Sequence, residues 1–183
     1  MFENIAVPSF EESRESKISR LIKEYHDKIY IYCFNILRNS HDAEDAVQEV
    51  FIKAFKSNNL LTIDNYSSWL YKIAYNHCIN QFRRKSMVSF ISFNSFTEKE
   101  KNQLLKEDIN QDVGTDIELD YIFSMLKPKE RALLTLRIVE DKDFNEIGSI
   151  LGISNATTRK RFERVKNKIQ NIIRGRLQDE GKN

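Results

Sequence analysis

The chain has 183 residues, of which 40% are hydrophobic and 31% are charged, a composition that suits one soluble domain or two small ones. Its five glycines and two prolines permit long helices and disfavour a β protein, and its formal net charge of +2 does not by itself indicate a nucleic-acid partner. No apolar run approaches membrane-spanning length, and residues 1–17 lack the basic-then-apolar order of a signal peptide. We therefore expect a cytoplasmic protein without membrane insertion.

The first helical zone covers residues 18–85 and follows an N-terminal tail, residues 1–17. Apolar side chains from Ile18 to Leu37 form one stripe at helical spacing. The polar break NSHD precedes a second helical pattern, Ala43 to Phe55, which Asp42 or Ser40 can cap. The loop SNNLLTIDNYSS then leads to a third pattern, WLYKIAYNHCINQFRRK. Because no single helix here can stand alone, we expect a compact bundle.

The two cysteines indicate neither a disulfide nor a metal site. Cys33 and Cys78 are far apart in the sequence and each lies in an apolar helical pattern, so we interpret them as core thiols. The three histidines form no ligand cluster with them, and we expect no metal and no cofactor. The sequence also contains no glycine-rich phosphate loop and no catalytic triad at a recognisable spacing, so we expect a protein that is not an enzyme.

Charge is segregated along the second half of the chain. Between Thr97 and Asp120, three basic residues stand against eight acidic ones, whereas between Ala156 and Arg176 eight basic residues stand against Glu163 alone. Residues 86–115 lose the helical period, which returns afterwards. We therefore expect an all-α protein with two small helical domains: residues 18–85, a flexible linker at 86–115, a second domain at 116–176 and a C-terminal tail at 177–183.

Residues 143–169 read DFNEIGSILGISNATTRKRFERVKNKI and have helix-turn-helix chemistry. Gly152 can supply the left-handed residue that ends one short helix, and Ser154 can cap the next. On this second helix the residues at 4-3-4 spacing face the core: Thr158, Phe162, Val165 and Ile169. The opposite side displays Asn155, Arg159, Lys160, Glu163 and Arg164. Such a helix can read a DNA major groove; the alternative is a solvated basic helix.

Three stretches, in this order, resemble the bacterial RNA polymerase sigma factors of the extracytoplasmic-function (ECF) group. They are DAEDAVQEVFIKAFK, WLYKIAYNHCINQFRRK and LKPKERALLTLRIVEDKDFNEIGSILGISNATTRKRFERVK. The resemblance implies a sigma region 2-like domain at 18–85 and a region 4-like domain at 116–176. It also implies core RNA polymerase, promoter DNA and an anti-sigma factor as partners. Two alternatives stay open: a stand-alone helix-turn-helix regulator, and a sigma-like adaptor that starts no transcripts.

The resemblance places polymerase binding on the outward face of the second helix. That face carries Asp42, Asp45, Gln48 and Glu49. An acidic face repels DNA phosphate, so it suits a basic protein surface better than DNA. The expected partner is the pair of clamp helices in the largest polymerase subunit. Without the resemblance, a merely solvated helix face is the simpler interpretation.

Capture of an opened −10 promoter element is assigned by the resemblance to the loop Leu61–Tyr66 and the third helix. Opened DNA needs aromatic and polar groups that hold unstacked bases, and cations for the backbone. The candidates are Leu61, Ile63, Asp64, Trp69, Tyr71, Lys72, Tyr75, Asn76, Arg83 and Arg84. Tyr71 and Asn76 are the candidates for a pocket that holds a flipped base. For Trp69, packing is an equally good interpretation.

Recognition of the −35 element is assigned to the second helix of the helix-turn-helix. Arg159, Lys160 and Glu163 are the expected base readers, and Asn155 can bond adenine. Thr157, Arg161 and Arg164 are expected to hold phosphate.

Overall fold

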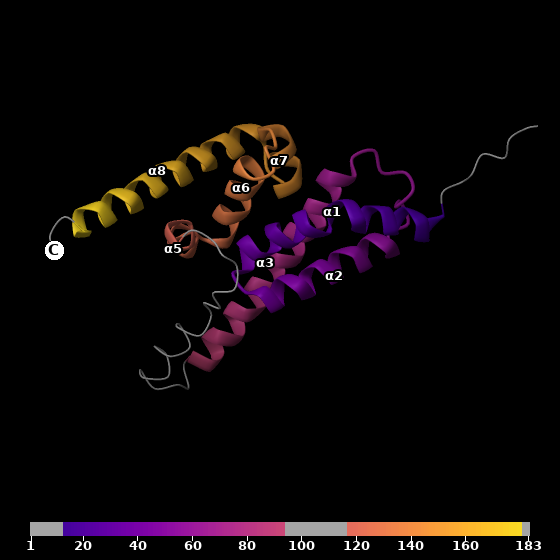
Figure 1. The fold of residues 1–183 in the computed structure, drawn as a ribbon, viewed down its shortest axis with the longest axis horizontal. Coiled ribbons are helices and arrows are strands. Elements are labelled where there is room, and N and C mark those ends of the chain that lie inside the picture. Colours follow the sequence, from indigo (N-terminus) through magenta and orange to yellow (C-terminus); the bar gives the residue numbers. More distant parts are fainter. Residues whose placement is uncertain (1–12, 94–116, 181–183) are drawn as a thin grey trace, which may run out of the picture.

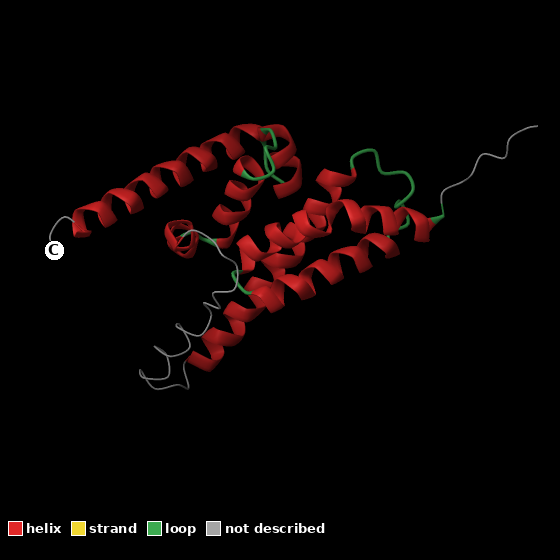
Figure 2. Ribbon diagram, viewed as in Figure 1, coloured by secondary structure: helices red, strands yellow, loops and turns green. Residues whose placement is uncertain are grey.

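The computed structural model describes residues 13–93 and 117–180, and within them the chain folds into seven helices and no strands (Figure 2). The predicted all-α fold is confirmed. Most of the predicted linker and both ends of the chain lie outside the described residues. The helices are α1 (Arg14–Leu37), α2 (Ser40–Lys56), α3 (Tyr66–Phe93), α5 (Ile117–Met125), α6 (Pro128–Ile138), α7 (Phe144–Leu151) and α8 (Asn155–Glu180).

Helices α1, α2 and α3 pack against one another and form an N-terminal bundle. Ile29, Val50 and Leu70 are fully buried, one from each helix, and burial of each such side chain contributes roughly 1.5–3 kcal/mol. The rings of Tyr32 and Tyr71 meet edge to face, with their centroids 5.1 Å apart. The helical stripes in the sequence therefore converge on one core, as expected.

The turn between α1 and α2 is built differently from the sequence prediction. Arg38 ends α1 in the left-handed region, at φ 60°. Asn39 caps α2, and its side-chain oxygen accepts a hydrogen bond of 2.9 Å from the backbone N–H of Asp42. The prediction that Asp42 or Ser40 caps this helix is therefore wrong. Asp42 is free to contact α3 because Asn39 supplies the cap.

Two further features of the bundle concern α3 and the cysteines. Helix α3 continues to Phe93, past the expected end of the first domain at Lys85. Cys33 and Cys78 are free and buried, as predicted for core thiols. A hydrogen bond with Cys78, and then burial, raise the pKa of the Cys33 thiol well above its ordinary value. The Cys33 thiol is thus kept neutral and unreactive.

Helices α6, α7 and α8 form a second group, and α8 runs past the other two (Figure 1). Lys168 on α8 pairs with Glu130 on α6 at 2.8 Å, and Arg176 stacks over the ring of Tyr121 on α5 at 5.1 Å. The two groups touch: α1 packs against α6, and α3 packs against α6 and α7. No helix within residues 13–93 and 117–180 combines the length and apolar character needed to cross a bilayer.

Candidate nucleic-acid interface

The sequence between α7 and α8 folds as a helix-turn-helix. Asp143 caps α7 by accepting hydrogen bonds from the backbone N–H groups of Asn145 and Glu146, at 2.7 and 2.9 Å. Gly152 ends α7 in the left-handed region at φ 68°, where a residue without a Cβ carries little strain. Ser154 begins α8 by accepting a hydrogen bond of 3.2 Å from the Thr157 N–H. The predicted roles of Gly152 and Ser154 are confirmed.

Gly148 allows the two helices to approach closely, which the sequence reasoning missed. A Cβ at this position would lie 2.7 Å from the carbonyl oxygen of Ile153 and 3.2 Å from Oγ1 of Thr158. Only glycine fits without moving the turn or α8. The available signal was a glycine inside an apolar helix, a position where it costs helix stability unless packing requires it.

The predicted inner face of α8 is the buried one. Thr158 and Val165 are 0% and 3% exposed, and Phe162 and Ile169 pack partly buried against the same core. Thr158 also donates to the carbonyl oxygen of Ser154 at 2.9 Å. The rings of Phe144 and Phe162 meet with their centroids 5.5 Å apart and join α7 to α8. These contacts fix the rotation of α8 about its axis.

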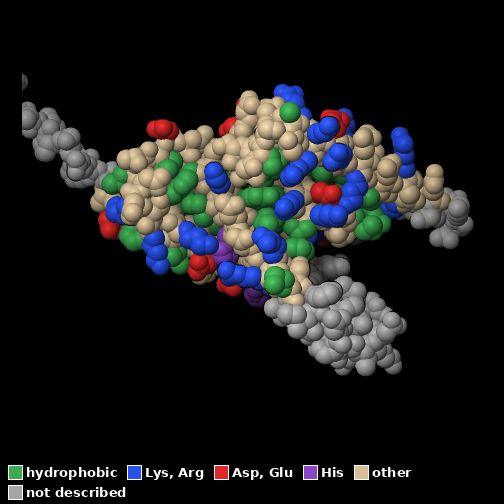
Figure 3. Space-filling model, turned by 180° about the vertical axis from the view of Figure 1, so that it is seen from behind, with side chains coloured by type: hydrophobic (Ala, Val, Ile, Leu, Met, Phe, Trp, Pro, Cys, Tyr) green, Lys and Arg blue, Asp and Glu red, His purple; other side chains and the backbone are tan. Residues whose placement is uncertain are grey.

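That rotation leaves a basic face of α8 open to solvent. Arg159, Lys160, Arg161, Glu163 and Arg164 are all exposed, whereas Asn155 and Thr157 are half-buried beside the turn. Lys and Arg side chains spread across both halves of the molecule on the face seen in Figure 3. A helix that is held by a brace helix and carries these four cations near its start can contact both phosphates and base edges in a DNA groove.

The acidic face expected on α2 divides into two parts. Asp45, Gln48 and Glu49 are exposed. Asp42 instead reaches α3, where it pairs with Lys85 and accepts a hydrogen bond of 3.2 Å from Gln81. Its side chain is only 18% exposed. Asp42 therefore fastens α2 to α3, and the other three residues remain available to a partner.

Gln48 also lines a groove between α1 and α2 that sequence reasoning did not identify. The groove has a volume of about 380 Å³, and its other lining residues are His26, Asp27, Tyr30 and Glu44. His26 and Tyr30 are four residues apart on α1, and Glu44 and Gln48 are four apart on α2, so each pair shares one helix face. The pairing of these faces depends on how α1 and α2 pack, and neither sequence stretch shows it alone.

The candidates expected on α3 occupy two different environments. Lys72, Asn76, Arg83 and Arg84 are exposed, and Trp69 is half-buried with its ring 6.3 Å from that of Tyr66. Tyr71 and Tyr75 are buried, 1% and 8% exposed. Burial, followed by the nearby Glu140 carboxylate, raises the pKa of Tyr71, and burial raises that of Tyr75. The structure thus separates Asn76 from Tyr71, which were expected to share one pocket.

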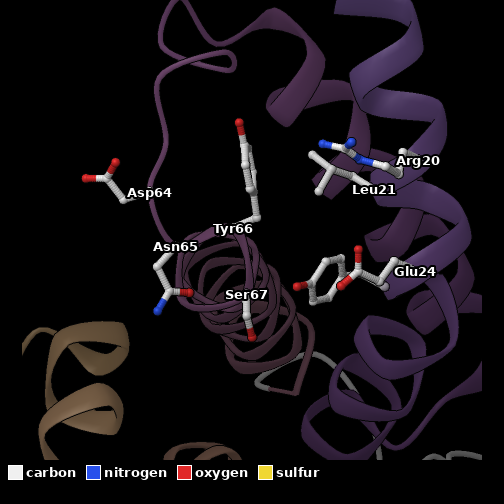
Figure 4. Close-up of a pocket in the computed structure, with 8 residues that line it drawn as sticks. Arg20, Leu21, Glu24, Asp64, Asn65, Tyr66 and Ser67 are labelled. Carbon is white, nitrogen blue, oxygen red and sulfur yellow. The ribbon is translucent and has the colours of Figure 1, made fainter. Parts of the chain in front are cut away.

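A pocket does lie beside the expected loop, but α1 forms its other wall. Asp64, Asn65, Tyr66 and Ser67 line one side of a pocket of about 330 Å³, and Arg20, Leu21, Glu24 and Tyr25 line the other; the Asp64 carboxylate is directed away from α1 (Figure 4). Of the three loop candidates, Asp64 lines this pocket, and Leu61 and Ile63 lie elsewhere in the loop, exposed and half-buried respectively. Residues of α1, which are far from this loop in the sequence, therefore belong to the same site. Nothing in the local sequence pattern indicated them.

Three contacts hold this loop against the bundle. The Tyr66 hydroxyl donates a hydrogen bond of 2.7 Å to the carbonyl oxygen of Leu60. The ammonium of Lys17 lies 4.8 Å from the centre of the Tyr66 ring, a favourable cation–π distance. Arg14 donates to the carbonyl oxygen of Ser57 at 2.8 Å. The loop is therefore anchored at both ends and at the start of α1.

Comparison with known proteins agrees with this two-part architecture. Residues 21–87 match the family described as Sigma-70 region 2, and residues 116–169 match Sigma-70, region 4. The first match covers the N-terminal bundle, and the second covers α5, α6, α7 and the start of α8. The chain belongs to the sigma-70 family of RNA polymerase sigma factors, which are transcription initiation factors and not enzymes.

Its curated relatives narrow the assignment within that family. The chain is 26% identical over 169 residues to the ECF RNA polymerase sigma factor SigE of Mycolicibacterium smegmatis, covering 92% of this chain and 63% of that protein. It is 28% identical over 163 residues to the ECF sigma factor SigW of Bacillus subtilis, covering 84% and 87%. The chain is a sigma factor of the ECF group, as its sequence motifs predicted.

A solved structure has the same fold. The sigma factor RpoE from Bartonella quintana, crystallised in complex with the anti-sigma factor NepR, superimposes with a TM-score of 0.68 at 18% identity. The match covers 85% of this chain and 96% of that one.

Proposed function

We propose that this protein binds core RNA polymerase and directs it to promoters by recognising −10 and −35 elements. One observation carries the proposal: a single chain presents an exposed acidic face on α2 and an exposed basic face on the second helix of a helix-turn-helix. The two faces suit partners of opposite charge, a basic protein surface and DNA. The proposal places the action of the protein in the cytoplasm, where bacterial polymerase meets DNA.

The −35 element is read by the exposed start of α8. Arg159, Lys160 and Glu163 point to solvent on the face opposite the buried Thr158 and Val165. Arg and Lys bond guanine edges, and Glu accepts from cytosine. Thr157, Arg161 and Arg164 contact DNA phosphates and so position the helix on the DNA backbone. Asn155 either orients Arg159 or forms hydrogen bonds with adenine.

Core polymerase binds the exposed face of α2 beside the groove that Glu44 and Gln48 line. Asp45, Gln48 and Glu49 contact the clamp helices of the largest subunit, and the groove beside Gln48 extends the contact to Tyr30 on α1. Asp42 keeps a supporting role because its carboxylate already pairs with Lys85.

The −10 element is opened on α3 and captured by the loop before it. Exposed Lys72, Asn76, Arg83 and Arg84 hold the strand, with Trp69 as a stacking surface. The pocket between Asp64 and α1 is large enough to take one unstacked base. Leu61 and Ile63 shape the loop around it.

An anti-sigma factor regulates this activity. The support is that the structural neighbour from Bartonella quintana was crystallised with the anti-sigma factor NepR. Such a partner would compete with core polymerase for the two halves of the chain.

In vitro transcription tests the proposal. Purified chain is mixed with core polymerase, and core binding is measured first, with a known sigma factor as the positive control. We expect a stable complex and transcripts that start at discrete promoters. Failure to bind core would favour a stand-alone helix-turn-helix regulator, and binding without transcripts would favour a sigma-like adaptor.

A further inference from the structure

Two asparagines connect the brace helix α7 to the first arginine of α8, the second helix of the helix-turn-helix. Asn145 on α7 accepts a hydrogen bond of 2.6 Å from the side-chain amide of Asn155. Asn155 in turn accepts a hydrogen bond of 2.9 Å from Nε of Arg159, one helical turn later on α8. We call these three side chains the brace relay. They can meet because α7 packs against α8 (Figure 1).

The chemistry of the brace relay fixes which way each amide group points. A guanidinium has donors only, so the atom of Asn155 that faces Arg159 must be its oxygen, Oδ1. The NH₂ group of Asn155 then faces Asn145, which must present its own oxygen as the acceptor. Turning either amide over would bring two donors together. Each hydrogen bond of the relay therefore depends on the other.

These contacts favour one of the two roles that are open to Asn155. An asparagine that recognises adenine uses its oxygen and its NH₂ group together, as a bidentate pair. In Asn155 both groups already have partners in the protein, and the side chain is half-buried beside the turn. Reading adenine would require these two bonds to be broken or shared. Orientation of Arg159 requires neither.

The brace relay holds Arg159 by the side of its guanidinium that DNA does not need. Because Nε donates to Asn155, the two terminal nitrogens remain available to a base. The guanidinium also lies 4.8 Å from the ring centre of Phe144 on α7, which is a favourable cation–π distance. A bond at Nε and a ring beside the group together restrict its direction. Two terminal N–H groups held in this way match the O6 and N7 acceptors of guanine.

We propose that Asn145 is a positioning residue for DNA specificity: from the brace helix, and through Asn155, it holds Arg159 in the orientation that reads a guanine of the −35 element. The inference rests on the proposed function, because it concerns the same DNA-binding face of α8. Asn145 acts without touching a base. Its loss therefore changes the base preference more than the general affinity for DNA, which phosphate contacts supply.

Selection from a DNA pool tests the proposal. The full chain, assembled with core polymerase, selects duplexes from a pool that carries a long randomised segment, and sequencing gives the preferred base at each position. We expect the wild type to select guanine at one position where Arg159→Ala lowers the preference about fivefold or more. Asn145→Ala should lower the same preference by roughly twofold to tenfold, because one orienting hydrogen bond is lost. Asn155→Ala breaks the relay from α8 and should act at the same position.

A double-substitution cycle separates positioning from a direct contact. In the Arg159→Ala background, Asn145→Ala should change the preference no further, because no arginine is left to orient. Asn145→Asp keeps an oxygen acceptor for Asn155 and should retain the guanine preference, while its negative charge weakens binding to every sequence alike. The matched control is Asn171→Ala, the same substitution at an exposed side chain of α8. It lies about 18 Å along the helix from Arg159, at about 1.5 Å per residue, and should select like the wild type.

Urea denaturation of each variant shows that it is folded, and if Asn145→Ala is not, the comparison of Asn155→Ala with the wild type decides. An unchanged guanine preference in the folded variant overturns the proposal, and so does a further loss in the Arg159→Ala background. A loss at a separate, adenine-selecting position in Asn155→Ala would also overturn it. These failures occur while the wild type selects a sequence. A wild-type polymerase complex that selects none would overturn the proposed function instead.

Discussion

Arg159 donates a hydrogen bond of 2.9 Å from Nε to the side-chain oxygen of Asn155, one helical turn earlier on α8. Asn155 in turn donates to the Asn145 side-chain oxygen at 2.6 Å, and the Arg159 guanidinium lies 4.8 Å from the Phe144 ring centre. The brace helix α7 therefore orients an exposed arginine of the recognition helix before any DNA is present. Such preorganisation lowers the entropy lost on binding.

Replacing this arginine should relax promoter specificity. We expect Arg159→Ala to lose about 1–3 kcal/mol at one base pair of the −35 element, because a bidentate contact to one base is removed. The measurement is binding of the polymerase complex to a set of promoters that differ by single base pairs in the −35 element. A uniform loss across all of them would show that Arg159 contacts phosphate instead. Arg164→Ala, assigned to phosphate, is the comparison and should weaken every sequence alike.

The close approach at Gly148 makes a prediction about stability. Gly148→Ala places a Cβ 2.7 Å from the Ile153 carbonyl oxygen, and overpacking of this kind costs roughly 1–3 kcal/mol. Gly175→Ala is the matched control, because nothing lies within 4 Å of its added Cβ. Because Gly175 lies within α8, five residues before its end, that change should stabilise the protein by up to roughly 0.5–1 kcal/mol. Urea denaturation measures both. Equal effects of the two substitutions would contradict the assigned packing role.

The contrast between these two glycines shows what local sequence can and cannot predict. Both interrupt a helical pattern in the same way, and only the tertiary distance to Ile153 separates them. Gly152 and Ser154 were predictable because a left-handed helix end and a helix cap are decided within a few residues. The Asn39 cap was missed because three neighbouring residues, Asn39, Ser40 and Asp42, offer the same chemistry, and only the backbone selects one.

The burial of Tyr71 could not be predicted from the sequence, for a different reason. Its position on α3 is set by local helical spacing, but its environment depends on Lys142 and Glu140, some seventy positions later in the chain. The same holds for the pocket beside Asp64, whose other wall is Arg20 and Glu24 on α1. Contacts between elements distant in sequence follow from packing and leave no periodic signal.

The division of the α2 face predicts different outcomes for two neighbouring substitutions. Replacing Gln48 and Glu49 together with alanine should weaken binding to core polymerase by at least 1 kcal/mol, about fivefold, as expected for central interface residues. The affinity of the chain for a −35 duplex without polymerase should not change, because α8 is untouched. Fluorescence anisotropy measures the affinity of the variant for core polymerase. An unchanged affinity would show that this face of α2 is only solvated and does not contact polymerase.

Asp42→Ala should instead lower stability. The substitution removes a part-buried hydrogen bond from Gln81, which is worth on the order of 1 kcal/mol. It also removes the ion pair with Lys85, whose side chain is 58% exposed, so that this pair adds only about 0–1 kcal/mol. The midpoint of urea denaturation should fall while the affinity of the folded chain for core stays near the wild-type value. A loss of core affinity with no change in the midpoint would place Asp42 in the docking face.

His77 gives the bundle a dependence on pH. Its Nδ1 lies 2.9 Å from the Lys53 ammonium across α2 and α3. Burial, and then Lys53, lower its pKa from the ordinary value of 6.5; Arg84 acts in the same direction, and Glu49 and Gln81 oppose it. The unfolded chain therefore binds a proton more readily than the folded one. This contribution to stability is fully present above pH 6.5 and is lost as the pH falls below it.

We expect His77→Gln to reduce the loss of stability between pH 7.5 and pH 5, measured by urea denaturation at each pH. The neutral amide keeps a polar side chain between α2 and α3 but takes up no proton. The matched control, His41→Gln, removes an imidazole that is exposed on the first turn of α2. If both variants lose the same part of the pH dependence, or if His77→Gln steepens it, the Lys53–His77 contact is not its source.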